Sequence, residues 1–167
     1  MQLRPARPSD ALAVARVHVC SWQAAYRGLL RDDYLDQLRP EDRAAHYDFS
    51  HADPFKPYTI VAGDGDSILG FATTSPSRDS ALPHHGELCA LYVDPDRWDQ
   101  KIGVSLIAAA RAHLIERGHR RAFLWLLAGN RRADRFYQID GWSPDGSERS
   151  DTIWGVTVNE LRYQRTL

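Results

Sequence analysis

The stretch that decides the fold is GELCALYVDPDRWDQKIGVSLIAAARAHLIERG, residues 86–118, which is followed by AFLWLL, residues 122–127. Leu88–Val93 is an unbroken apolar run, as is typical of a strand covered on both faces. Gly103–Arg117 spaces its apolar residues by three and four, which predicts a helix. The apolar run at 122–127 predicts the next buried strand. A strand, a helix and a second strand in this order form a βαβ unit, which is right-handed in nearly all proteins.

The rest of the chain predicts shorter elements on both sides of this unit. Met1–Arg7 alternates weakly, as an edge strand does, and Pro8–Asp10 offers an N-cap for a helix that Gly28 ends. Gly63–Asp66 separates two β-rich runs, which predicts a hairpin. The other predicted elements are helices at Asp32–Leu38, Glu41–Phe49 and Arg131–Ile139, hairpin strands at Tyr58–Ala62 and Ser67–Thr74, and a long final strand at Ile153–Tyr163. Together they predict one α/β domain with a mixed sheet over residues 1–167.

The predicted final strand has an irregular pattern. Its apolar residues change parity between Val158 and Leu161. An extra residue in one strand shifts the alternation of faces by one position, so the pattern predicts a β-bulge near Asn159.

Composition and charge exclude several classes of protein. The 167 residues, 43% of them hydrophobic and 26% charged, suit one globular domain. Because 21 Lys and Arg residues stand against 22 Asp and Glu residues, the chain lacks the basic excess that would hold a nucleic-acid backbone. The apolar runs fall short of the ~20 residues that span a bilayer, and no hydrophobic segment of the signal-peptide kind follows the N-terminus. Cys20 and Cys89 form no CxxC pair, so we expect neither a disulfide framework nor a zinc site, and a cytoplasmic location. Taken together, these observations predict a protein without nucleic-acid, membrane or metal partners.

Three segments of the chain carry a resemblance to a known enzyme family. Gly86–Pro95 and Trp98–Leu106 resemble the fourth strand and the pyrophosphate loop of the GNAT acyltransferases, which move an acetyl group from acetyl-CoA to an amine. Asn130–Trp142 is similar to that family's Asn-x-x-Ala-x-x-Phe-Tyr-x-x-x-Gly-Phe segment, with Trp142 in place of the final Phe. Ser21–Gly28 also resembles the first helix of a bacterial branch of these enzymes.

The resemblance covers nearly the whole chain and implies both a fold and a co-substrate. The implied fold is the GNAT type, a mixed, mostly antiparallel central sheet flanked by helices, with the βαβ unit at the cofactor site. The implied co-substrate is acetyl-CoA, with direct transfer through a tetrahedral intermediate and no metal. The residues implied to bind the cofactor are Leu91, Tyr92, Val93, Trp98, Asp99, Lys101, Ile102, Gly103, Val104, Asn130 and Tyr137.

A helix that begins after a buried strand suits the pyrophosphate of CoA in physical terms. Its first backbone N–H groups are unpaired, its dipole is positive at that end, and a glycine lets a phosphate approach. Gly103 has this setting, although a plain strand-to-helix turn would place a glycine there equally well.

The loop before Gly103 departs from the family's usual Arg/Gln-x-x-Gly-x-Gly/Ala pattern. Trp98 stands at the Arg/Gln position and Lys101 at the first glycine, while Asp99 adds a negative charge beside the expected phosphates. A residue other than glycine at a positive φ costs ~1 kcal/mol or more, which the Lys101 ammonium could offset by pairing with a phosphate. These departures leave open a second function, a catalytically silent acyl-CoA-binding or sensor module on the same fold.

Acetyl transfer to an amine needs a proton acceptor and a proton donor. An amine of the lysine kind has a pKa of about 10.4, so a base must remove its proton. Glu87 matches the position at which many GNAT enzymes carry such a carboxylate, and an exposed strand-end glutamate is the alternative. Tyr137 matches the family's general acid, which protonates the leaving thiolate, and a core tyrosine is the alternative. The resemblance also implies that the splayed strand around Leu91–Val93 stabilises the oxyanion with backbone N–H groups.

The expected acceptor is the primary amine of a small molecule or of a peptide. Trp22 and Tyr26 belong to the helix that shapes the acceptor pocket in GNAT enzymes, although their spacing alone places them in the core. Cys89 lies in an apolar run and is expected to be a packed side chain. Exposed aromatic side chains at Trp142 and Trp154 would allow a homodimer.

Overall fold

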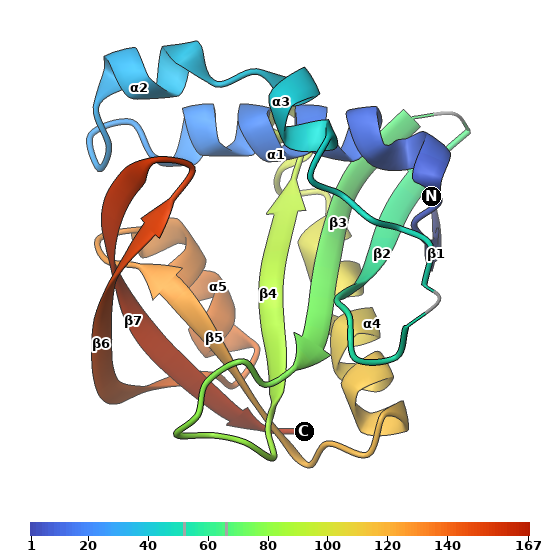
Figure 1. Ribbon diagram of the computed structural model, residues 1–167, viewed down its shortest axis with the longest axis vertical. Coiled ribbons are helices and arrows are strands. Elements are labelled where there is room, and N and C mark those ends of the chain that lie inside the picture. The colour runs from blue at the N-terminus through green and yellow to red at the C-terminus, as the bar shows by residue number, and fades with distance from the viewer. Residues whose placement is uncertain (52, 66) are drawn as a thin grey trace.

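Seven strands form one twisted sheet in the order β1-β2-β3-β4-β5-β7-β6 in the computed structural model, which describes residues 1–51, 53–65 and 67–167 (Figure 1). The strands are β1 (Gln2–Pro5), β2 (Tyr58–Asp64), β3 (Ser67–Pro76), β4 (Gly86–Val93), β5 (Arg121–Leu127), β6 (Ser143–Ile153) and β7 (Val156–Thr166). The helices are α1 (Ala11–Ala25), α2 (Asp32–Gln37), α3 (Pro40–Ala44), α4 (Ile102–Glu116) and α5 (Arg131–Ile139). Only the β4–β5 pair is parallel among the described strands, so the predicted mixed, mostly antiparallel sheet with a βαβ unit is confirmed.

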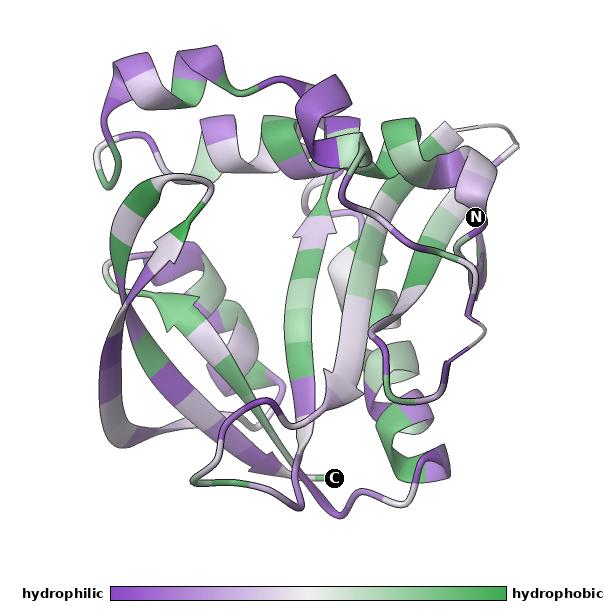
Figure 2. Cartoon of the chain, viewed as in Figure 1, coloured by the Kyte–Doolittle hydropathy of each residue, from purple (hydrophilic) through white to green (hydrophobic). Residues whose placement is uncertain are grey.

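Helices cover both faces of this sheet. On one face α1 packs Val14 and Val17 against Val61 and Phe71. On the other face α4 packs the apolar side that the spacing predicted, with Leu106, Ile107, Ala110 and Leu114 in the largest core cluster. Figure 2 shows hydrophobic residues along much of β4 and β5, which lie in the interior of the sheet order. No helix in the described part of the chain is long and apolar enough to cross a membrane.

Strands β4 and β5 pair only at their start and then diverge (Figure 1). The paired positions are Gly86 with Ala122 and Glu87 with Phe123. Beyond them, no described strand pairs with the β5-side edge of β4, so its backbone polar groups face an opening in the sheet. A bulge at Cys89, where the register with β3 shifts, reverses the faces to which the following β4 side chains point.

The end of the chain differs from the prediction of one long strand over Ile153–Tyr163. The chain turns at Trp154 and Gly155, whose φ angles of 51° and 79° match the tight two-residue turn of a hairpin. Strand β6 went unpredicted because its sequence, Ser143–Thr152, is almost entirely polar, as suits a sheet edge. Trp142 is buried at 2% exposure, so the expectation of an exposed aromatic there is wrong.

The predicted bulge near Asn159 is also wrong. Strand β7 pairs with β5 without a break from Glu160 to Thr166, and the irregularity lies on β6 between Pro144 and Glu148. The parity changes because both faces of β7 are buried. Val158 and Glu160 point to a cavity on the α1 side, whereas Leu161 and Tyr163 pack into the large core.

The segment after α3 is extended rather than helical. The helix predicted over Glu41–Phe49 is limited to Pro40–Ala44. Tyr47 and Phe49 leave the helix and stack on one another with ring centroids 5.0 Å apart. This segment forms part of the cavity wall described below.

Candidate functional site

One large cavity of about 1340 Å³ passes through the opening between β4 and β5. Its walls come from α1, the α3 region, β4, the start of α4, β5, α5 and the β6–β7 hairpin. Every residue that the sequence pointed to as a site residue lines it: Trp22, Tyr26, Glu87, Leu91, Tyr92, Val93, Trp98, Asp99, Lys101, Ile102, Gly103, Val104, Asn130 and Tyr137. The fold thus gathers residues from four separate segments into one site.

The start of α4 presents unpaired backbone donors to this cavity. Lys101 precedes the helix in the left-handed conformation, with φ 63° and ψ 8°, and its side chain does not cap the helix. The first helical hydrogen bond runs from the Ser105 N–H to the Lys101 carbonyl over 3.1 Å, so the three N–H groups before Ser105 remain free for an anion. A Cβ on Gly103 would lie 3.4 Å from the Phe136 ring, an ordinary van der Waals contact, so the packing of α4 against α5 does not by itself require glycine here.

The negative charge of Asp99 is paired with a cation from α5. The Arg132 guanidinium donates to the Asp99 carboxylate over 3.0 Å and lies over the Trp98 ring, 4.2 Å from its centroid. The Trp98 indole N–H in turn donates to the Val93 carbonyl over 2.9 Å. Trp98 therefore fastens the loop to the end of β4, and Arg132 offsets the acid that the sequence placed beside the anion site.

Tyr137 lies at the boundary between the core and the cavity. It belongs to the large core cluster and it also lines the cavity. Asn130 fixes the start of its helix, because the Asn130 carboxamide oxygen accepts from the Ala133 N–H over 3.2 Å. Burial first, and then the nearby Tyr92, raise the pKa of Tyr137 well above its ordinary value. Its phenol is therefore protonated at neutral pH and can donate.

Glu87 is buried, with 4% of its surface exposed, so the alternative of an exposed strand-end glutamate is wrong. Its two carboxylate oxygens accept from the Arg78 guanidinium over 2.7 and 3.0 Å. The Arg78 backbone N–H adds a longer contact of 3.3 Å. Arg78 thus fixes the position of the Glu87 side chain at the point where β4 and β5 begin to part.

Aromatic side chains close the α1 side of the cavity. The Trp22 indole N–H donates to the Tyr92 hydroxyl over 3.0 Å, and the hydroxyls of Tyr26 and Tyr92 lie 3.4 Å apart. Trp22 also packs on Trp154 at the β6–β7 turn, with ring centroids 4.3 Å apart. Buried His18 shares a 2.7 Å hydrogen bond with the Tyr47 hydroxyl. Trp22 and Tyr26 are therefore at once core residues and walls of the site.

A model of the Acetyltransferase (GNAT) family matches residues 22–142, most of the chain and most of this site. The chain belongs to the GNAT acetyltransferase family.

Individual relatives agree with this assignment. The chain is 29% identical over 160 residues to an uncharacterized N-acetyltransferase of Bacillus subtilis named YuaI, covering 95% of this chain and 89% of the relative. A GCN5-related N-acetyltransferase from Rhodopseudomonas palustris has the same fold, with a TM-score of 0.75, 21% identity and coverage of 99% and 95% of the two chains. The yncA acetyltransferase from Salmonella typhimurium, solved with its cofactor acetyl-CoA, gives a TM-score of 0.72 at 15% identity, covering 99% of this chain and 93% of that one.

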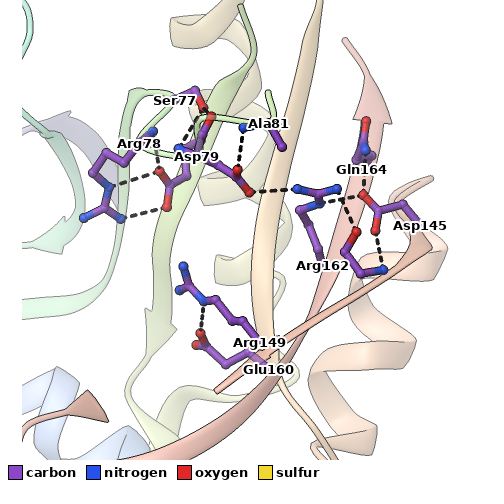
Figure 3. A network of polar contacts seen from close by, with 11 residues as sticks. Ser77, Arg78, Asp79, Ala81, Asp145, Arg149, Glu160, Arg162 and Gln164 are labelled. Carbon is purple, nitrogen blue, oxygen red and sulfur yellow. Dashed lines mark hydrogen bonds and ion pairs between the residues drawn. The ribbon is translucent and has the colours of Figure 1, made fainter. Parts of the chain in front are cut away.

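A second buried carboxylate in this GNAT site, Glu160, was missed by the sequence reasoning. It is 6% exposed and lines the cavity from β7. The Arg149 Nε–H donates to one of its oxygens over 2.7 Å, the one hydrogen bond to this carboxylate within the described residues (Figure 3). Burial, opposed by Arg149, raises the pKa of Glu160. The parity change after Val158 was its signal, because Glu160 continues the cavity-facing side of the strand.

A polar network holds the loop between β3 and β4 against the β6–β7 hairpin (Figure 3). Arg162 on β7 donates to Asp79 of the loop over 2.7 Å and to Asp145 on β6 over 2.6 Å. Because Asp79 follows Arg78 directly, this anchor also fixes the arginine that binds Glu87.

The thiol of Cys89 also lines the cavity of this GNAT chain. Burial raises the pKa of the Cys89 thiol to about 11, so the thiolate is scarce at neutral pH, in line with a packed side chain. Among the described residues, no group of three or more His, Cys, Asp or Glu side chains is placed to hold a metal ion.

Proposed function

We propose that this protein is an acetyl-CoA-dependent N-acetyltransferase that transfers the acetyl group directly to a primary amine of a small molecule or a peptide. One observation carries the proposal. A helix N-terminus with free N–H groups, the diverging β4 edge, a protonated phenol and two buried carboxylates all line the same cavity. The fold match to a GNAT protein solved with acetyl-CoA adds support.

The residues of the opening fit the two ends of acetyl-CoA. The free N–H groups at the start of α4, with the basic side chains of Lys101 and Arg132 nearby, would hold the pyrophosphate. The unpaired edge of β4 around Leu91–Val93 would pair with the pantetheine amides and supply N–H groups to an oxyanion. Bound acetyl-CoA supplies the thioester, whose C–S bond breaks as the amine forms its C–N bond.

We propose that Glu160 accepts the proton that the amine loses. The raised pKa of Glu160 and its oxygen without a hydrogen bond from the described residues suit a base better than a carboxylate with both oxygens occupied. Glu87, the residue that the sequence favoured, is the alternative base, and its pairing with Arg78 suits it to holding the ammonium form of the substrate.

We propose that Tyr137 is the acid. Its phenol donates to the sulfur, on which negative charge grows as the thiolate leaves, and the proton released by the amine restores the phenol through solvent. A free thiol has a pKa of about 8.5, so the leaving thiolate gains a proton at neutral pH. The raised pKa of Tyr137 keeps its phenol protonated and available as the donor throughout the neutral range.

A silent acyl-CoA-binding module is the second candidate, and it rests on Lys101, which occupies a left-handed position where the family usually has glycine. Thermal unfolding with and without acetyl-CoA, together with thiol release over a panel of amines, distinguishes the two functions. A ligand at a hundred times its dissociation constant stabilises by ~2.7 kcal/mol. We expect both a shift and thiol release. A shift without thiol release would favour the silent module, and no shift at millimolar acetyl-CoA would overturn both.

A further inference from the structure

Arg43 on α3 is a cation without an anion. It lines the cavity and is half-buried, and its guanidinium lies 4.4 Å from the centroid of the Trp154 ring and 5.3 Å from that of Tyr47. It forms no ion pair with any residue that the structure describes, and its Nε–H is buried without a hydrogen-bond acceptor. This Nε–H is out of reach of a ligand, so what Arg43 offers the cavity is a positive charge that no described carboxylate neutralises.

The other cations of the cavity differ from Arg43 in this respect. Those that face carboxylates are Arg78 with Glu87, Arg149 with Glu160, Arg132 with Asp99 and Lys56 with Asp48. The arginines that remain are exposed to solvent at Arg97, Arg131 and Arg135. Lys101 is also exposed to solvent, so Arg43 is the one half-buried arginine among the described cavity residues that has no carboxylate partner.

Arg43 and the two carboxylates line the cavity from different elements, Arg43 from α3, Glu87 from β4 and Glu160 from β7. The charges of Arg43 and Glu160 both act on the Tyr92 phenol. Burial raises the pKa of Tyr92, the Glu160 carboxylate adds to the rise and the Arg43 guanidinium opposes it. The surface near Arg43 is formed by the rings of Trp154, Tyr47 and His18, which suits a carbon skeleton.

We propose that the acceptor is an amine that also carries a carboxylate, with the carboxylate bound by Arg43 and the amine directed toward Glu160 and Glu87. This inference rests on the proposed function and narrows its acceptor to amino-acid-like molecules. A planar guanidinium binds a carboxylate through two parallel hydrogen bonds, and the charge of arginine is constant over the working pH range. A bound carboxylate neutralises the Arg43 charge, which no carboxylate of the described residues does.

The test compares acids with their amides. The substrates are amino acids in which one to five carbons separate the amine from the carboxylate, each paired with the carboxamide of the same skeleton, and kcat/KM is measured by thiol release. A charge-assisted hydrogen bond contributes enough to predict that the best acid exceeds its amide by about 10- to 100-fold. Arg43→Gln should remove this preference by lowering kcat/KM for the acid alone, and Arg43→Lys should keep part of it. Arg16→Gln, on the exposed side of α1, is the matched control and should keep the full preference.

Several results would overturn the inference. One is a wild-type protein with equal kcat/KM for each acid and its amide. Another is an Arg43→Gln protein in which kcat/KM falls by the same factor for acids and amides, because an equal loss indicates a packing effect of Arg43 alone. A second readout separates this inference from the proposed function. If no member of the series releases thiol, the panel of amines named under the proposed function decides whether the transferase proposal fails, and the thermal shift caused by each acid and amide in the presence of CoA decides this inference. A shift by acids that Arg43→Gln abolishes would support the carboxylate site, and its absence would refute it.

Discussion

Glu160 and Arg149 are joined by a single hydrogen bond of 2.7 Å, whereas the Arg78 guanidinium donates one hydrogen bond to each carboxylate oxygen of Glu87. This difference separates two buried carboxylates that face the same cavity. One is locked into a bidentate pair, and the other keeps an oxygen available. The hydrogen bonds of each carboxylate therefore favour Glu160, which keeps an oxygen without a hydrogen bond from the described residues, as the proton acceptor.

The first prediction concerns Glu160→Gln. Loss of a general base should lower kcat/KM by at least ~100-fold at neutral pH. In the wild type, the base works only when ionised, so the rate should fall as the pH drops through the pKa of Glu160, which lies above its ordinary value. A pH-rate profile of the variant should lack this acidic limb.

The control for this variant is Glu148→Gln, which changes an exposed glutamate on neighbouring β6 and should leave the profile unchanged. Glu87→Gln should raise KM for the amine more than it lowers kcat, because Glu87 is paired with Arg78. If Glu87→Gln instead removes the acidic limb and Glu160→Gln does not, the base is Glu87.

The second prediction concerns the Tyr137 hydroxyl, which makes no hydrogen bond to any described residue and so contributes little to folding. Tyr137→Phe should lower kcat by ~100-fold or more and leave both the melting temperature and the shift caused by acetyl-CoA in place. The matched control is Tyr163→Phe. It removes a 2.7 Å hydrogen bond to Asp134 and should cost about 1 kcal/mol of stability with little change in kcat. A Tyr137→Phe enzyme with normal turnover would remove the phenol from the mechanism.

The third prediction concerns Lys101, whose φ of 63° is unfavourable for a residue with a side chain. Lys101→Gly should raise the unfolding free energy by up to ~1 kcal/mol, because glycine adopts this conformation without strain. If the Lys101 ammonium also binds a phosphate, KM for acetyl-CoA should increase several-fold in the same variant. Lys101→Ala separates the two effects, since it removes the ammonium and keeps the strain. An unchanged KM in both variants would leave pyrophosphate binding to the backbone N–H groups alone.

The features that could be predicted from the sequence are those that depend on residues close together along the chain. The apolar run of β4 and the spacing of α4 are local, so the βαβ unit could be predicted from them, whereas Tyr137 was indicated by the resemblance of Asn130–Trp142 to the GNAT family. The roles of Arg78 and Glu160 could not, because each depends on a partner that another segment brings close. The turn at Trp154 was hidden for the opposite reason: apolar residues continue across it, and only the left-handed backbone reveals the hairpin.

The fourth prediction concerns the stability of the protein against acid. Burial, and then the nearby Arg43 charge, hold the pKa of His18 well below its ordinary value, so this ring stays neutral in the folded protein. Below about pH 6.5 the unfolded chain binds a proton at His18 that the folded chain does not, so the unfolding free energy should fall by ~1.4 kcal/mol per pH unit for this group. This contribution is complete above pH 6.5 and is lost as the pH drops toward the folded-state pKa.

The measurement is chemical unfolding from pH 7 to pH 5 for wild type and His18→Gln, which keeps a polar partner for the Tyr47 hydroxyl. The variant should have a lower unfolding free energy than the wild type at pH 7. Its unfolding free energy should also fall less steeply on acidification, because the one proton that binds at His18 in the unfolded wild type is missing. His113, whose pKa is also lowered by burial, supplies a comparison, because its ring is less enclosed and His113→Gln should reduce the slope by a smaller amount. A His18→Gln slope equal to that of the wild type would mean that His18 becomes protonated within the folded aromatic wall, and that the Arg43 side of the cavity accommodates a second positive charge.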